Sequence, residues 1–353
     1  MLETSSNQIK IPTIFYIAAT VVVFAGVMYS STIVTQFLMA LFIGIISAKP
    51  VAYLRTKGMS NGLAVAIVLF SIILISFSLG GVLGTSIANF TANLDAYNVK
   101  VSAGFTKIFD LLESVGVKGS KEQLLKTIDP GVIMNFTAKL LNGLGNLMGN
   151  MAMILLIVGF MLAESTSYGV KLRAVLNQPD SSIQSITMAV NQINQYLGIK
   201  TMTSLATGVI IGLSLWAIGV DFPFMWGLIA FMMNYIPNIG SFIAAIPALF
   251  MAFISLGGAG VLWTGLVFLI VNIGIGSILE PKIMGNGLGI STLVILLSLI
   301  FWGWILGTTG MFLSIPLTLA AKIAFEANPS TRWVSVILGT EKDAHDILDK
   351  RGH

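Results

Sequence analysis

Between Thr201 and Ala321 the chain carries only three charged residues, which are Asp221, Glu280 and Lys282. A segment this apolar has no surface that water would solvate, so it predicts helices that lie in lipid. A charged side chain at the centre of a bilayer costs about 2.5–3.5 kcal/mol or more. The same segment nevertheless contains asparagine and proline residues, which require hydrogen bonds or break helices. Polar, interrupted backbone within an apolar block is typical of solute sites in membrane transporters.

The overall composition supports the same class of protein. Hydrophobic residues make up 56% of the 353-residue chain and charged residues only 10%, whereas soluble domains are about one quarter charged. The apolar runs are long and continuous, without the two-residue alternation of an outer-membrane barrel. We therefore predict an all-α polytopic membrane protein.

The composition also excludes several kinds of chemistry. The chain has no cysteine, which removes thiol catalysis, thiolate metal sites and disulfides. Its two histidines, His345 and His353, lie in the C-terminal tail, so no catalytic histidine or histidine metal site is expected in the apolar core. The net charge of +4 comes from basic residues at the ends of apolar segments, which indicates topology control rather than nucleic-acid binding. No phosphate-binding loop of an ATP-driven motor is present, and we expect neither an enzyme nor a cofactor.

Runs of roughly 20 apolar residues predict about eight membrane spans. The first, Ile11–Tyr29, is interpreted as a membrane helix rather than a signal peptide, because no convincing cleavage site follows it. The basic loop from Lys49 to Lys57 marks the cytoplasmic side and places the N-terminus there, and basic residues of the tail place the C-terminus on the same side. The other predicted spans are Thr32–Ala48, Asn61–Leu83, Gly145–Leu162, Thr201–Val220, Val261–Leu279, Ser291–Leu306 and Met311–Phe325.

Two segments differ from the spans. Residues 85–144 carry mixed charges with helical patterning, which predicts a small helical domain on the outer face. Residues 165–200 combine an apolar and an amide-rich helical face, which predicts an amphipathic cytoplasmic helix. The predicted organisation is therefore spans one to three in 1–84, the outer domain in 85–144, span four in 145–164, the amphipathic helix in 165–200, spans five to eight in 201–326, and a cytoplasmic tail in 327–353.

The segment 222–256 has two apolar arms, each too short to cross a bilayer comfortably, around the run Asn234-Tyr235-Ile236-Pro237-Asn238-Ile239-Gly240. Pro237 removes a backbone donor, and Gly240 allows the dihedral angles of a turn. We predict a re-entrant helical hairpin, with two complete spans as the alternative. The charge distribution favours the hairpin, because the termini share one side only if 222–256 enters and leaves on one face.

The broken segment is also the strongest candidate for a solute site. Unwound backbone exposes N–H and C=O groups that lipid cannot satisfy. The side chains of Asn234, Tyr235 and Asn238 add donors and acceptors that suit a polar, hydroxylated solute. The alternative is that these residues only cap and fix the hairpin.

A second candidate site is the helix end formed by Glu280 and Pro281. The Glu280 carboxylate could bind a cation, relay a proton or pair with Lys282, or it could only mark the end of the span. Asn272, in the middle of its span, is expected to hydrogen-bond another helix or the solute, whereas Lys200 is interpreted as an anchor at the membrane edge. The candidate site residues are Asn234, Tyr235, Pro237, Asn238, Gly240, Asn272, Glu280 and Pro281.

The motifs around the predicted hairpin and the Glu280 helix end resemble those of a known family. They are the run Asn234–Ser241 with Ala244-Ala245-Ile246-Pro247, and Leu279-Glu280-Pro281-Lys282-Ile283-Met284-Gly285 with Gly287–Ser291. Phe301-Trp302-Gly303-Trp304 and the run Gly310–Thr318 extend the resemblance, which covers essentially the whole chain. On these residues the chain resembles the autoinducer-2 exporter family, and in particular its members from enteric bacteria. Thr308-Thr309 departs from the family pattern, in the turn between the last two spans.

This resemblance implies a multi-pass protein of the bacterial inner membrane that exports the quorum-sensing signal autoinducer-2 or another small polar solute. It also implies a homo-oligomer, with a pentamer as the expected form, and membrane lipid as a further partner. Other family members resemble sodium (lithium)/proton antiporters, so antiport with Glu280 as the exchanging carboxylate is an alternative. A non-transporting membrane scaffold is a second alternative.

Overall fold

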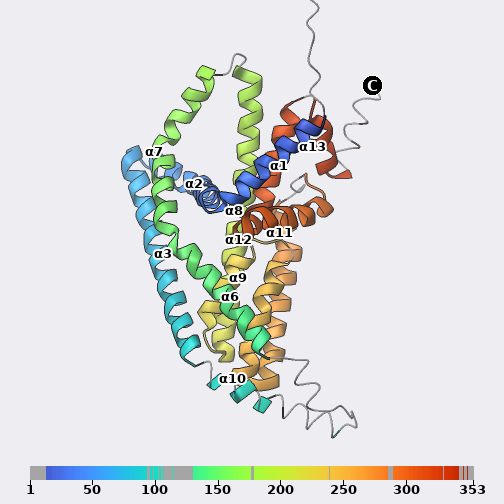
Figure 1. The fold of residues 1–353 in the computed structure, drawn as a ribbon. Coiled ribbons are helices and arrows are strands. Elements are labelled where there is room, and N and C mark those ends of the chain that lie inside the picture. The colour runs from blue at the N-terminus through green and yellow to red at the C-terminus, as the bar shows by residue number, and fades with distance from the viewer. Residues whose placement is uncertain are drawn as a thin grey trace, which may run out of the picture.

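The computed structural model describes residues 13–93, 96–97, 99–101, 103–104, 106, 114, 130–175, 179–237, 239–284, 289–328, 330–341, 345 and 348. Every regular element in these residues is a helix, and no strand occurs among them (Figure 1). The predicted all-α class is therefore confirmed for this part of the chain.

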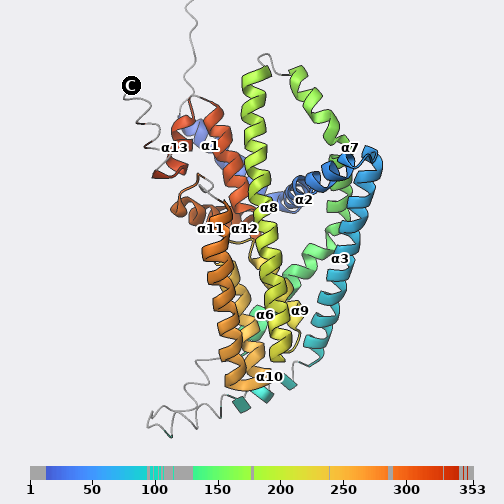
Figure 2. The ribbon, with the colours of Figure 1, turned by 180° about the vertical axis from the view of Figure 1, so that it is seen from behind.

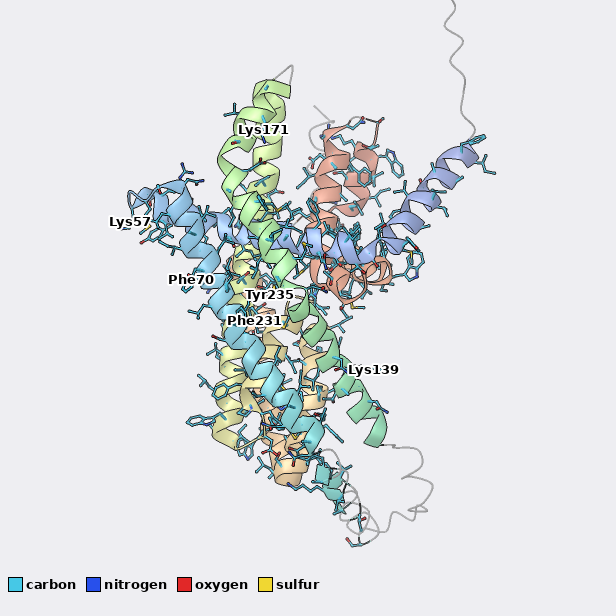
Figure 3. All side chains as sticks on the ribbon, turned by 60° about the vertical axis from the view of Figure 1, so that its left-hand side comes forward. Lys57, Phe70, Lys139, Lys171, Phe231 and Tyr235 are labelled. Carbon is cyan, nitrogen blue, oxygen red and sulfur yellow. The ribbon has the colours of Figure 1, made fainter. Side chains whose placement is uncertain are left out.

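The N-terminal part contains three helices. They are α1 (Thr13–Tyr29), α2 (Ser31–Thr56) and α3 (Asn61–Ala92). Figure 3 shows α2 lying across the other helices, with Lys57 at its outer end, while α3 continues from that end along the side of the molecule.

The middle of the chain forms α6 (Pro130–Gly149), α7 (Met151–Val175) and α8 (Pro179–Ile218). Helix α8 is continuous over 40 residues, so the predicted amphipathic helix and fifth span are parts of one element. The ends of α7 and α8 project together beyond the other helices at the top of Figure 1. The middle of the predicted outer domain, from 107 to 129, lies outside the described residues apart from Ser114.

A helical hairpin follows α8. Helix α9 (Pro223–Met233) leads to a non-helical tip, after which α10 (Gly240–Val271) begins. Helix α10 continues into the π-helix η1 (Asn272–Leu279) and the short helix α11 (Glu280–Met284). Figure 2 shows α8 and α10 side by side in the lower half of the molecule, where they pack together.

The last helices are α12 (Thr292–Ala327) and α13 (Arg332–Leu338). Both α10 and α12 contain one glycine with non-helical dihedral angles, Gly257 (φ 69°, ψ −153°) and Gly307 (φ 65°, ψ −149°). At each of these glycines the chain folds back on itself. Across the Gly257 turn, a Cβ at Gly265 would lie 3.6 Å from the Leu249 side chain. Across the Gly307 turn, the Trp302 indole N–H donates to the Thr318 hydroxyl at 3.0 Å. The predicted break between 306 and 311 is therefore confirmed, at Gly307.

The two turns share more than their dihedral angles. Each glycine follows a leucine, and a second glycine, Gly260 or Gly310, stands three positions later. A Cβ on Gly260 would meet the carbonyl oxygen of Ala252, and one on Gly310 would meet that of Trp302, in the limb before the turn. The structure thus repeats one glycine-dependent helical turn, although the sequence shows no extended internal repeat.

We expect Gly257→Ala and Gly307→Ala to destabilise the protein by about 1–3 kcal/mol each, because this backbone region is essentially restricted to glycine. Thermal unfolding in detergent measures the loss. Gly258→Ala is the matched control, since a Cβ at this helical position has no atom within 4 Å. Equal unfolding temperatures for Gly257→Ala and Gly258→Ala would contradict the turn geometry.

The surface of the helices fits a lipid environment. Five helical segments among the described residues are long and apolar enough to cross a membrane, namely 31–56, 61–92, 190–218, 240–284 and 292–327. Large apolar side chains lie exposed on them, including Phe70, Phe77, Trp216, Ile270 and Trp304. An apolar surface of this extent indicates contact with lipid. The chain is therefore a multi-pass α-helical membrane protein.

Candidate functional site

Close packing of α8 against α9 positions the hairpin tip. Gly208 and Gly212, four residues apart on α8, face Gly227 on α9. A Cβ on Gly227 would lie 2.6 Å from the carbonyl oxygen of Gly208 and 2.9 Å from the Cα of Gly212. Small residues at this spacing let two helices in a membrane approach to backbone contact. Helix α9 of the hairpin therefore packs directly against α8 and runs antiparallel to it.

Two hydrogen bonds join the tip to α8. The Asn234 amide donates to the Ser204 hydroxyl at 3.0 Å, and both residues are buried. The Tyr235 hydroxyl donates to the Thr201 hydroxyl oxygen at 3.0 Å. The Thr201 hydroxyl in turn donates to the carbonyl oxygen of Leu197 at 2.7 Å. The polar side chains of the tip thus meet a row of hydroxyl groups on α8.

A buried ion pair lies next to this row. The Lys200 ammonium of α8 is 2.7 Å from Oε1 of Glu280, the first residue of α11. The two side chains are only 6% and 14% exposed. The Thr203 hydroxyl lies 3.3 Å from the second carboxylate oxygen of Glu280. Because removing both charges from water is costly, their mutual attraction and the additional hydrogen bond are needed to hold them there.

These residues form one polar group, which we call the hairpin-tip cluster: Lys200, Thr201, Thr203, Ser204, Asn234, Tyr235 and Glu280. Figure 3 shows Tyr235 and Phe231 near the centre of the molecule, where α2 crosses the bundle. The cluster offers hydroxyl and amide groups that can donate and accept hydrogen bonds, together with one ion pair of zero net charge. Such a set suits a neutral, polar solute, and its carboxylate could also exchange its ammonium partner for a cation.

The structure brings three of the predicted site residues together, Asn234, Tyr235 and Glu280. Pro237 lies half-buried at the tip, and Asn238 lies outside the described residues. Lys282, the partner proposed for Glu280 from the sequence, is exposed, and Lys200 takes that place.

The other predicted residues have different surroundings. Gly240 is the first residue of α10, where a Cβ would clash with the carbonyl oxygen of Met233. Asn272 begins the π-helix η1 and is half-buried, and π-helical turns occur frequently at functional sites. Pro281 is exposed and follows Glu280 in α11, which continues directly from η1.

The sequence-based interpretation of Lys200 as a membrane-edge anchor is wrong, because the residue is 5% exposed and paired with Glu280. The roles of Thr201, Thr203 and Ser204 were also missed. A signal for Thr203 and Ser204 exists in the sequence, since they recur with Lys200 and Thr207 at helical spacing and form one polar stripe on an apolar helix.

The fold and the cluster together define a helical membrane protein with a polar site at interrupted helices. Residues 17–330 match the AI-2E family of transporters, and the chain belongs to this family. It is 37% identical over 332 residues to the AI-2 transport protein TqsA of Escherichia coli, covering 94% of this chain and 96% of TqsA. It is 36% identical over 323 residues to YhhT of the same organism, covering 92% and 93% of the two chains. A relative from Haemophilus influenzae is 37% identical over 338 residues, covering 94% and 97%.

The predicted family resemblance is therefore confirmed. The family consists of transporters, so this chain is a transporter and not an enzyme. The scaffold hypothesis is not retained.

Proposed function

We propose that the chain is a secondary transporter or facilitator that exports autoinducer-2 across the bacterial inner membrane. The observation that carries the proposal is the hairpin-tip cluster, which joins the broken helix tip, α8 and α11 in one buried polar group. A relative with 37% identity over most of its length, TqsA, is named as an AI-2 transport protein. In the proposed mechanism the hairpin and the η1–α11 segment shift together, so that the cluster faces each side of the membrane in turn.

The chemistry of the cluster fits a small polyhydroxylated solute such as autoinducer-2. A neutral polyol presents donors and acceptors but no formal charge, so it needs the same mixture from its site. Asn234, Tyr235 and the hydroxyls of α8 supply that mixture. The Lys200–Glu280 pair carries no net charge, so a neutral solute could bind beside it without a counter-ion.

We also infer how the chain crosses the membrane. Helix α9 has 11 residues, a length of about 16 Å, or roughly half of the 30 Å hydrocarbon core. This length supports a re-entrant hairpin over 222–256, with about eight complete spans around it and both termini in the cytoplasm. Asn238 and Asn272 complete the solute site in this arrangement, and the chains assemble as a homo-oligomer, with a pentamer as the expected form.

Efflux of autoinducer-2 from cells tests the site assignment. We expect Asn234→Ala and Asn238→Ala, expressed at the wild-type level, to reduce efflux by about tenfold, because each removes hydrogen bonds to a solute in a buried site. Asn191→Ala is the matched control, since this exposed amide lies on the part of α8 remote from the tip. Unchanged efflux in both tip variants would show that the solute binds elsewhere.

The Lys200–Glu280 pair also supports a second candidate function, sodium (lithium)/proton antiport. A small cation or a proton would replace the Lys200 ammonium at the Glu280 carboxylate, and the pair would re-form after release. Sodium-driven proton movement in proteoliposomes, abolished by Glu280→Gln, is the result that would favour antiport. Autoinducer-2 flux without sodium or proton coupling would favour the facilitator.

A further inference from the structure

Tyr235 also lines a cavity that lies beside the hairpin-tip cluster. This apolar cavity of about 280 Å³ lies between α2, α3, α7, α9 and α12. The rings of Phe42, Phe231 and Tyr235 line it, and the two phenylalanine rings each contact the Tyr235 ring edge to face, with centroids 5.7 Å apart. Figure 3 shows Phe231 and Tyr235 side by side near the middle of the structure.

The size and lining of the cavity indicate what it can hold. Apolar cavities of about 150 Å³ stay dry and take up benzene-sized molecules. At about 280 Å³, this cavity is roughly twice that size. No charged residue is among the described residues that line it. The occupant is therefore mainly apolar, unlike the solute proposed for the hairpin-tip cluster.

Two serines are among the residues that line the cavity. Ser47 of α2 is only 4% exposed and Ser76 of α3 is half-buried, and both line the cavity. Among the described residues, neither hydroxyl has a hydrogen-bond partner. Ser71 and Ser78 of α3 behave differently, because they donate to the carbonyl oxygens of Ile67 and Leu74 at 2.8 Å and 2.9 Å.

A hydroxyl that faces an apolar cavity without a partner is costly, so an occupant that hydrogen-bonds Ser47 would complete the site. We propose that this cavity binds a small amphipathic molecule: an alkyl or aryl body larger than benzene, carrying one hydroxyl or carbonyl group that hydrogen-bonds Ser47. A phospholipid fits less well, since it brings two chains and a charged headgroup to a lining without charged residues. The site is separate from the solute site, and the two share only Tyr235.

Photolabelling of the purified transporter with a diazirine derivative of 1-octanol tests the proposal. We expect labelled peptides from α2 and α9 around Phe42 and Phe231, and unlabelled 1-octanol should compete. Ser47→Ala keeps the cavity but removes a hydroxyl, so it should weaken competition about three- to tenfold. Ser78→Ala is the matched control, because its hydroxyl already bonds its own helix and does not line the cavity. Ile72→Trp should fill the cavity and abolish the labelling.

Three outcomes would overturn the proposal. Absence of label in the lining would indicate a cavity filled with water. Labelling of the lining that is unchanged by Ser47→Ala and by competing 1-octanol would indicate unspecific partition from the membrane. A phospholipid that co-purifies with the wild type, and is lost in Ile72→Trp by native mass spectrometry, would make the occupant a lipid. None of these results depends on autoinducer-2 transport, so they leave the proposed function untouched.

Discussion

Lys200→Met is expected to destabilise the protein by about 3–5 kcal/mol, because it leaves the buried carboxylate of Glu280 without its cation. The pair has a separation of 2.7 Å and little exposure, so water cannot replace the lost ammonium. Unfolding in detergent, followed by temperature or denaturant, measures the effect. Lys171→Met is the matched control, since Lys171 pairs with Glu164 at 3.4 Å with side chains that are 61% and 57% exposed. An exposed pair of this kind contributes about 0–1 kcal/mol.

The double variant Lys200→Met/Glu280→Met tests whether the stability lost in Lys200→Met comes from leaving a buried carboxylate unpaired. Replacement of both partners of a buried pair by apolar residues is often neutral or stabilising, so the double variant should recover most of the stability lost in Lys200→Met. A single-variant loss as small as that of Lys171→Met would mean that the pair is solvated. A double variant no more stable than the single one would mean that Lys200 stabilises the fold through its packing instead.

Gly227→Ala is expected to have the second large effect, on both stability and transport. Its new Cβ would lie 2.6–3.0 Å from backbone atoms of Gly208 and Gly212, which cannot move like a flexible side chain. Overpacking of this kind costs about 1–3 kcal/mol. The shift should also separate Asn234 from Ser204, so autoinducer-2 efflux per folded molecule should fall as well.

Gly84→Ala serves as the control for Gly227→Ala, because a Cβ at that position of α3 has no atom within 4 Å. Melting temperature and efflux, both normalised to folded protein, are compared for the two variants. Wild-type efflux in a destabilised Gly227→Ala variant would show that transport does not depend on the position of the hairpin. Wild-type values for both quantities would contradict the close approach of α8 and α9.

Local features of the fold could be predicted from the sequence. Long apolar runs require helices in lipid, and the proline and asparagines of the segment 234–240 interrupt helix wherever they are placed. The break near Gly307 was expected from the boundary between two apolar runs. These predictions depend on neighbouring residues only, which is why they transfer directly from sequence to structure.

The cluster itself could be predicted only in part. Asn234, Tyr235 and Glu280 stand out as polar residues in an apolar block, but their partners come from α8. Glu280 and Lys200 are separated by 80 residues, and the polar stripe that contains Lys200 does not indicate which distant residue it pairs with. The nearer Lys282 was the wrong partner for the same reason. Only the packing of α8, α9 and α11 decides between them.

The π-helix was not anticipated, and neither was the glycine geometry of the two turns. A π-helix differs from an α-helix by its hydrogen-bond register, which the apolar pattern around Asn272 does not encode. Gly257 and Gly307 lie among many other glycines, and only the folded backbone shows which of them have positive φ. Both features lie in the segments that lead to or follow Glu280.

Flux of labelled autoinducer-2 into proteoliposomes is the most direct test of the central claim that the hairpin-tip cluster is the solute site of a transporter. Wild-type protein should carry autoinducer-2 well above protein-free vesicles. Folded Asn234→Ala protein should lose most of that flux, while Asn191→Ala protein keeps it. Wild-type flux no greater than that of empty vesicles, or equal flux in the two variants, would contradict the account.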